Sequence, residues 1–120
     1  NNRWLSKAPC IVVCCADPAM VYHKLVRKLV PVDLALMDVT IAAEHLVLAA
    51  AEEGIGSCWV GWFSEDKVAD ILKLPKGWRV MSLLALGWPE RPLEETEPKR
   101  KPLPEIAFDS SPENPWGSVD

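Results

Sequence analysis

The chain has 120 residues, of which 49% are apolar and 25% are charged, and its formal net charge is −4. This length suits one domain, and these proportions are typical of a globular chain and not of a disordered one. The acidic balance argues against a general nucleic-acid-binding protein, which presents a basic surface. No uninterrupted apolar run reaches the roughly 18–20 residues that cross a bilayer, and the start NNRWLSKAP lacks the order of a signal peptide. We therefore expect neither a nucleic-acid nor a membrane partner.

The four cysteines are predicted to be structural. Cys10, Cys14, Cys15 and Cys58 form no C-x-x-C pair and no Cys/His cluster with zinc spacing, so we predict no metal site. Cys10 and Cys14 would share one face of a strand, with Cys15 on the other. We expect buried apolar thiols in a reducing compartment, the cytoplasm, with a redox or metal role as the less favoured alternative.

The first half of the chain predicts a strand and then a long helix. Residues 10–15 form a continuous apolar run, as in a strand buried on both faces. Residues 19–30 read as a short basic amphipathic helix or a loosely ordered crossing segment. Apolar residues at helical spacing follow, and Asp38 can cap a helix there. We prefer an earlier start after Pro31, which gives a helix from Asp33 to Glu53. It is apolar on nearly all sides, so other elements or a second subunit must wrap it, and we predict a core helix.

The second half predicts a strand, a helix and a strand. Gly54 can take the left-handed conformation that ends the long helix, with Ile55 folding back on its last turn. Residues 57–61 are apolar and too few for a helix, so we predict a buried strand. Ser64 then caps a helix that ends at Leu74-Pro75, with the acidic Glu65 and Asp66 in its first turn. The run RVMSLLAL at residues 79–86 has the composition and length of a strand.

The sequence Trp59-Val60-Gly61-Trp62-Phe63 connects the predicted strand to the capped helix. Two indoles around a glycine leave backbone N–H groups beside flat apolar walls, which suits a planar ligand with a polar edge. The alternative is simple packing at a strand end.

From Glu90 onward the chain predicts an extended tail. Its prolines exclude a helix interior or a central strand, and they stand at positions 92, 98, 102, 104, 112 and 115. The cations of Lys99-Arg100-Lys101 are either a solvated charge run or a binding element. The apolar anchors of the tail are Ile106-Ala107-Phe108 and Trp116.

Five pieces of the chain, taken in order, resemble the nitroreductase family of flavin mononucleotide (FMN)-dependent oxidoreductases. They are KAPCIVV from residue 7, the run DVTIAAEHLVLAAAEEGIGSCWVG from residue 38, ADILKLP from residue 69, LALGWP from residue 84 and KRKPLPE from residue 99. The resemblance covers about residues 8–106. The arginine- and serine-rich segment that usually opens the family domain does not precede Ala8, and Trp62 stands where many members carry glycine.

The resemblance implies an α+β fold, with a mainly antiparallel sheet packed on a long central helix and an extended C-terminal tail. Residues 1–108 would be the C-terminal portion of the family domain, with the tail from about residue 90, and residues 109–120 a C-terminal extension. The tail of family members typically wraps a partner subunit, which implies a homodimer.

The resemblance also implies the site. Trp59, Val60, Gly61 and Trp62 would line the flavin edge, with the Gly61 N–H facing the N5 atom of FMN. Lys99 and Arg100 would face the flavin phosphate, and Tyr22 and His23 are possible substrate contacts. NADH or NADPH would reduce the flavin, which would pass hydride to a nitroaromatic, a quinone or a similar electron-poor small molecule.

Two other functions stay open from the sequence. One is a flavin-binding or dimerisation module without turnover. The other is a family relative with dehalogenase or flavin-modifying chemistry. The chain has no catalytic triad, P-loop or G-x-G-x-x-G motif, and no side chain is assigned a catalytic role because flavin carries the chemistry. His45 is interpreted as a core or interface residue.

Overall fold

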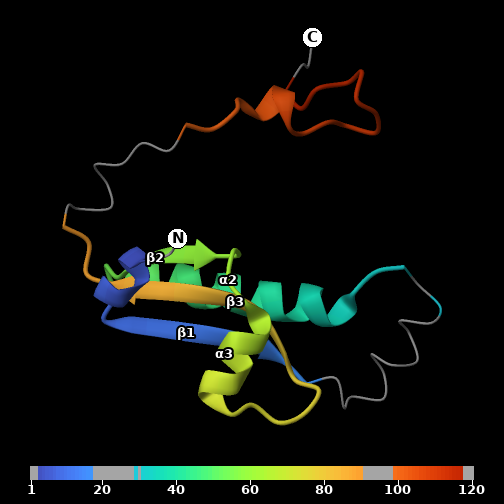
Figure 1. The fold of residues 1–120 in the computed structure, drawn as a ribbon. Coiled ribbons are helices and arrows are strands. Elements are labelled where there is room, and N and C mark those ends of the chain that lie inside the picture. Colours follow the sequence, from blue (N-terminus) through green and yellow to red (C-terminus); the bar gives the residue numbers. More distant parts are fainter. Residues whose placement is uncertain (1–2, 18–28, 30, 91–98, 118–120) are drawn as a thin grey trace.

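The computed structural model describes residues 3–17, 29, 31–90 and 99–117 (Figure 1). In chain order its elements are the 3-10 helix η1 (Arg3–Lys7), β1 (Cys10–Ala16), α2 (Leu34–Glu52), β2 (Gly56–Val60), α3 (Glu65–Leu72), β3 (Arg79–Gly87) and the 3-10 helix η3 (Leu103–Glu105). Helices and an antiparallel sheet confirm the predicted α+β class. The predicted helix or crossing segment at residues 19–30 lies almost wholly outside the described residues.

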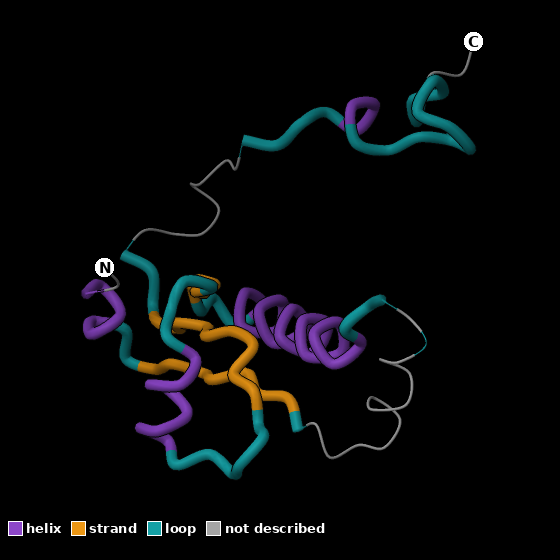
Figure 2. The backbone as a smooth tube through the Cα atoms, turned by 45° about the vertical axis from the view of Figure 1, so that its right-hand side comes forward, coloured by secondary structure: helices purple, strands orange, loops and turns teal. Residues whose placement is uncertain are grey.

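The three strands form one antiparallel sheet in the order β1-β3-β2. β3 is the central strand, and Leu84 on it is fully buried between Val12 of β1 and Trp59 of β2. Figures 1 and 2 show α2 and α3 on opposite sides of this sheet. The packing on the α3 side centres on Val60, Val80 and Leu83. Val80 and Leu83 are three residues apart on β3 and share this side because the β1–β3 register shifts between Cys14 and Cys15, which interrupts the regular alternation of side chains.

The start of α2 is tied to the start of β3. Asp33 is the N-cap: one carboxylate oxygen accepts from the Leu36 N–H at 3.2 Å, and the other accepts from Arg79 Nη1 at 2.7 Å. This confirms the longer of the two predicted helices, since Asp38 lies inside it. Pro31 precedes the cap by two residues, so it does not begin the helix.

The end of α2 agrees with the sequence prediction. Gly54 has a φ of +73°, and the Ile55 N–H donates to the Ala50 carbonyl at 2.8 Å. A second bond runs from the Gly54 N–H to the Ala51 carbonyl at 3.0 Å. This pair of bonds is the Schellman motif, which satisfies the last carbonyls of the helix and aims the chain into β2.

The prediction of a core helix is wrong for the single chain. Ala43 is the one buried residue of α2. Several large apolar side chains of the helix are exposed, with exposed fractions of 45% to 59% for Leu36, Met37, Ile41 and Leu48. The three-stranded sheet is too narrow to cover a helix that is apolar all round, so much of this surface is left open.

By length and composition alone, α2 is also long and apolar enough to cross a membrane, with a mean hydropathy of 1.7. This was not predicted from the sequence, because Asp38, Glu44 and His45 interrupt the apolar residues of the helix. Glu44 and His45 stand next to the middle of the helix, where a bilayer would make an ionised side chain costly. The helix also packs on all three strands. These features favour a helix that packs against protein.

α3 begins after Ser64 as predicted, but it ends at Leu72, two residues before the predicted end at Leu74, and both of its ends are built differently from the prediction. Ser64 is the N-cap residue, yet its hydroxyl makes no capping hydrogen bond. At the other end Lys73 takes the left-handed conformation, with a φ of 54°, and the Leu74 N–H bonds to the Ala69 carbonyl at 3.0 Å. A lysine thus occupies the conformation that usually falls to glycine.

The cysteines are less buried than predicted. Cys10 and Cys58 are exposed, and Cys14 and Cys15 are half-buried, with all four thiols free. Ile11 is 41% exposed, so β1 is not buried on both faces. The reason is that β1 and β2 are the two edges of the sheet, and the helices cover only part of each.

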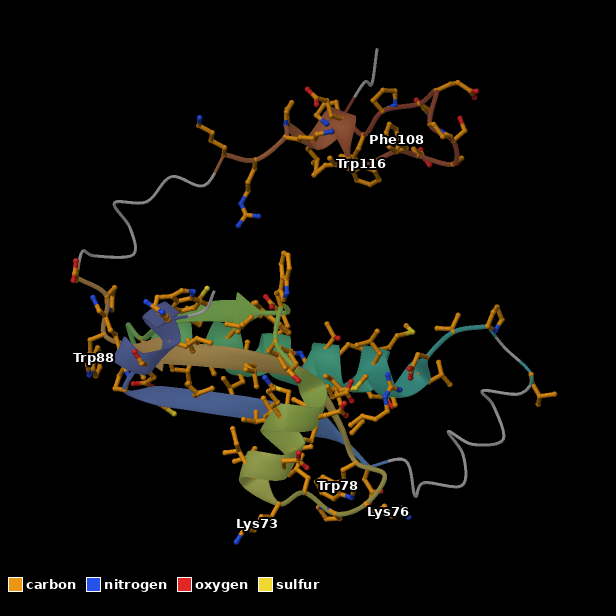
Figure 3. All side chains as sticks on the ribbon, in the orientation of Figure 1. Lys73, Lys76, Trp78, Trp88, Phe108 and Trp116 are labelled. Atoms are coloured by element: carbon orange, nitrogen blue, oxygen red, sulfur yellow. The ribbon has the colours of Figure 1, made fainter. Side chains whose placement is uncertain are left out.

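The tail contains a small hairpin-like loop after η3. Phe108 and Pro115 form an isolated bridge, and the Trp116 N–H donates to the Ala107 carbonyl at 2.8 Å. Figure 3 shows Phe108 and Trp116 close together in this loop, which is drawn apart from the sheet in every view. The bridge spans the predicted border between residues 108 and 109, and that border stays a prediction.

Candidate functional site

The predicted ligand corner lies where β2 leaves the sheet. Val60 is the last residue of β2 and is 4% exposed, while Phe63 packs back onto the cluster that Val60 forms with Val80 and Leu83. Gly61 and Trp62 therefore connect two anchored residues. The corner is short, and both of its ends are held by the core.

Gly61 is open on the side where a side chain would stand. A Cβ built at Gly61 meets no atom of the described residues within 4 Å, in contrast to Gly87, where a Cβ would lie 3.0 Å from the Pro9 ring. Gly61 is thus not required for packing within this chain, which weakens the alternative of a simple packing glycine. The space beside this strand-end backbone is open to the edge of a planar ligand.

The two tryptophans of the corner differ in burial. Trp59 pairs with Leu84 across the sheet and is partly covered, at 38% exposed, whereas Trp62 is 90% exposed. The Trp59 indole therefore forms part of the wall of the corner, and the Trp62 indole projects from that wall.

The remaining predicted site residues are not gathered at this corner. Lys99 and Arg100 are exposed at the start of the tail, which Figures 1 and 2 draw away from the sheet. Tyr22 and His23 lie outside the described residues. The single chain thus brings together Trp59, Val60, Gly61 and Trp62 only, and the roles of all eight residues stay predictions.

The opposite end of β2 carries a feature that the sequence analysis missed. Gly56 pairs with Gly87, and the rings of Pro9 and Pro89 pack against this pair. They form part of an open surface pocket of about 430 Å³ that is lined by Trp4, Lys7, Ala8, Pro9, Gly56, Ser57, Cys58, Ala85, Leu86, Gly87, Trp88 and Pro89. Figure 3 shows Trp88 at this end of the molecule. The sequence does contain a signal for this pocket. The sheet register brings together three short runs, A-P, G-I-G and L-G-W-P, and these runs taken together could have predicted it.

Among the described residues, two titratable groups have shifted pKa values, Arg79 at the start of β3 and the Cys15 thiol on β1. The hydrogen bond that the Arg79 guanidinium donates to the Asp33 carboxylate raises the pKa of Arg79 above its ordinary value. Burial, and then the neighbouring Cys14, raises the pKa of the Cys15 thiol. In the described part of the chain, no group of His, Cys, Asp and Glu side chains is arranged to hold a metal ion.

The comparison with known families decides the identity. The sequence model of the nitroreductase family matches residues 1–88. This chain belongs to the nitroreductase family. The match ends just after β3, so it includes the sheet, both α-helices and the Trp59–Trp62 corner, and it leaves the tail outside.

Two curated proteins are similar to this chain over most of its length. A protein of Archaeoglobus fulgidus whose provisional name is NADH dehydrogenase/NAD(P)H nitroreductase is 30% identical over 93 residues, which are 74% of this chain and 49% of the relative. A 5,6-dimethylbenzimidazole synthase of Rhodospirillum rubrum is 30% identical over 109 residues, which are 85% of this chain and 51% of the relative. The chain spans about half the length of these curated relatives.

Solved structures of nitroreductases share the fold. A nitroreductase family protein from Clostridium novyi NT is 36% identical, with a TM-score of 0.58 over 69% of this chain and 44% of its own. The observed sheet and helices are therefore part of a known nitroreductase fold.

Proposed function

We propose that the protein is an FMN-dependent oxidoreductase that accepts hydride from NADH or NADPH and reduces a nitroaromatic, a quinone or a similar electron-poor small molecule. The observation that carries this proposal is the corner at the end of β2. It lies within the part matched by the nitroreductase family, it is anchored on both sides, and it is open at Gly61. When bound there, FMN would supply the hydride chemistry.

The residues of this chain would hold and tune the flavin. Trp59 would be an apolar wall, and the backbone N–H groups of Gly61 and Trp62 would donate to the polar edge of the ring. Such donors favour the negative charge that develops on reduction. Lys99 and Arg100 would bind the phosphate, a task for which the planar guanidinium is suited.

We further propose that the active form is a homodimer, as is typical of nitroreductase family members. Two observations support it. The exposed Met37, Ile41 and Leu48 share one side of α2. The tail, which carries the cations that we propose for the phosphate, is drawn away from the sheet (Figure 1). In a dimer, the apolar face of α2 would be covered and the tail could reach the flavin of the partner subunit. Four free thiols suit the cytoplasm, where we place the protein.

An absorbance spectrum of the purified protein, taken before and after NADH or NADPH is added, tests the proposal. Flavin bands that bleach anaerobically with a nicotinamide and return when an electron-poor acceptor is added support it. Flavin bands that never bleach would indicate a binding module without turnover. A colourless protein that does not take up added FMN would contradict flavin binding.

A second candidate is an enzyme that modifies the flavin, and one observation favours it: a relative that is similar over 85% of this chain is named a 5,6-dimethylbenzimidazole synthase. Mass spectrometry of the flavin after prolonged aerobic reaction separates the two. An oxidoreductase returns FMN unchanged after many turnovers, whereas a flavin-modifying enzyme consumes it.

A further inference from the structure

The end of α3 and the loop that leads to β3 carry exposed apolar side chains on the side of the sheet away from α2. Ile71 and Leu72 are 78% and 47% exposed, and Trp78, just before β3, is 38% exposed. Figures 1 and 2 show α3 and this loop projecting from the sheet. We call residues 71–78 the α3 tip. Because the tip and the open face of α2 lie on opposite sides of the sheet, a dimer formed through α2 would leave the tip uncovered.

Two lysines accompany these apolar side chains. Lys73 and Lys76 are exposed, and among the described residues no hydrogen bond or ion pair holds either side chain. The tip contains no acidic residue, and the nearest acid before it in the sequence is Asp70 on α3. Figure 3 shows Lys73, Lys76 and Trp78 at the same end of the molecule. The tip is therefore a locally positive apolar surface on a chain whose net charge is −4.

The backbone of the tip is held in place. Leu74 packs against the core cluster, and its N–H donates to the Ala69 carbonyl at 3.0 Å. The Trp78 N–H donates to the Pro75 carbonyl at 3.1 Å, which closes the turn before β3. A surface that is already ordered loses little conformational entropy when it binds.

We propose that the α3 tip binds the surface of an anionic lipid membrane. Ile71, Leu72 and Trp78 enter the boundary between headgroups and acyl chains, and the ammonium groups of Lys73 and Lys76 reach the lipid phosphates. Exposed apolar and aromatic side chains beside lysines are typical of proteins that lie on a membrane without crossing it. The expectation of no membrane partner rested on the absence of a spanning run and a signal peptide, and neither is needed for surface binding.

The lysines favour a lipid surface over a protein partner. Lysine is depleted at protein–protein interfaces, where its flexible, strongly hydrated ammonium is costly to cover. At a lipid surface its aliphatic stem lies along apolar groups while the ammonium stays among phosphates and water. The cytoplasmic leaflet, which the protein would face in the cytoplasm, supplies the negative charge.

Sedimentation with vesicles tests the proposal on the full chain. We expect the parent to sediment with vesicles of about 30% phosphatidylglycerol in phosphatidylcholine, and to stay in the supernatant with phosphatidylcholine alone. Binding should weaken severalfold between about 0.1 M and 1 M NaCl, because the Debye length falls from about 10 Å to about 3 Å. The lipid concentration at half-binding is the quantity measured.

Substitutions in the tip should weaken binding to the anionic vesicles. Lys76→Gln and Lys73→Asn should each raise the half-binding concentration about fivefold, the contribution of one lysine near an anionic surface. Asparagine is chosen at position 73 because it tolerates the positive φ there. Ile71→Ser should raise the concentration about five- to tenfold, since part of an aliphatic side chain no longer leaves water. Thermal unfolding checks that each variant is folded.

Matched controls place the effect at the tip. Lys101→Gln and Lys28→Gln each remove one lysine elsewhere in the chain, and Trp88→Ser removes an indole that is 76% exposed at the end of β3. Each should stay within about twofold of the parent, because a cation or an apolar group far from the membrane contributes little.

Several results would overturn the proposal. A parent that ignores the anionic vesicles, or that binds vesicles of phosphatidylcholine alone equally well, would do so. An unchanged Ile71→Ser variant would show that no apolar side chain enters the lipid. A Lys76→Gln variant that loses no more affinity than Lys101→Gln or Lys28→Gln would place the binding in another basic segment. The flavin spectrum has no part in these measurements, so they can fail or succeed independently of the proposed function.

Discussion

Gly61 matters to the proposed reaction through its backbone, because glycine offers an N–H without a side chain in the way. A Cβ there meets no described atom within 4 Å, so Gly61→Ala should fold as the parent does, and it keeps the N–H while adding one methyl group as a control for bulk. Gly61→Pro deletes the N–H. A hydrogen bond to a group that gains charge contributes roughly 1.5–3 kcal/mol, so we expect flavin reduction to slow about tenfold or more. Stopped-flow bleaching by NAD(P)H measures this. A folded, flavin-loaded proline variant that is reduced at the parental rate would show that the flavin does not lie at this corner.

Cys15 should be the least reactive of the resolved thiols. Its burial, and then Cys14, raises its pKa, and the thiolate is the reactive form. At pH 8 we expect iodoacetamide to label the exposed Cys10 and Cys58 first and Cys15 last, with Cys15 catching up as the pH rises. The raised pKa also means that the stability linked to this thiol is complete below the unfolded-state pKa and is lost as the pH rises through the folded-state pKa. Mass-spectrometric peptide mapping follows the labelling, and equal rates at Cys10 and Cys15 would refute the expectation.

At the scale of elements, the end of α3 contains backbone strain at Lys73 that a substitution by glycine would remove. Lys73 has a φ of 54°, which costs a residue with a Cβ roughly 1–2 kcal/mol, partly offset by the greater chain entropy of an unfolded glycine. Lys73→Gly should therefore raise the free energy of unfolding by about 0.5–1 kcal/mol in urea titrations. Lys76→Gly in the same loop is the matched control and should bring no gain, because Lys76 has no positive φ. A destabilised Lys73→Gly variant would contradict this account.

At the start of α2, two substitutions of Asp33 distinguish the stability contributed by helix capping from that contributed by the ion pair with Arg79. Asp33→Ala removes both and should lower the free energy of unfolding by about 1–2 kcal/mol. Asp33→Asn keeps a good capping oxygen and loses only the partly exposed pair with Arg79, so we expect a loss of a few tenths to about 1 kcal/mol. Thermal or urea unfolding compares the two. If asparagine were as damaging as alanine, the ion pair and not the cap would dominate.

At the scale of the whole molecule, the open face of α2 predicts a dimer that depends on it. Ile41→Glu places a charge in that face and should convert a dimer to a monomer at micromolar concentration in light scattering, since a buried unpaired charge is costly. Ile71→Glu is the control. Ile71 is also an exposed isoleucine, but on α3, and its variant should remain dimeric. A parent protein that is already a stable monomer would refute the dimer itself.

Local features of the fold were predictable because their causes are local. The stop of α2 at Gly54 follows from one residue that tolerates a positive φ, and the strands follow from short apolar runs between turn residues. The position of Ser64 as a cap was likewise predictable. The absence of a capping hydrogen bond from its hydroxyl was not predictable, because that bond depends on side-chain geometry that the sequence pattern leaves open.

By itself, the sequence determined the family, the order of helices and strands, and the Trp59–Trp62 corner as the candidate site, since each is encoded in contiguous residues. Only the tertiary structure decided which apolar residues are covered. β1 and β2 became edge strands and α2 kept an open face, because coverage depends on how many strands lie beside a helix and not on the helix itself. For the same reason, the exposed Trp62 and the meeting of Pro9 with Gly56 and Gly87 became visible only in three dimensions.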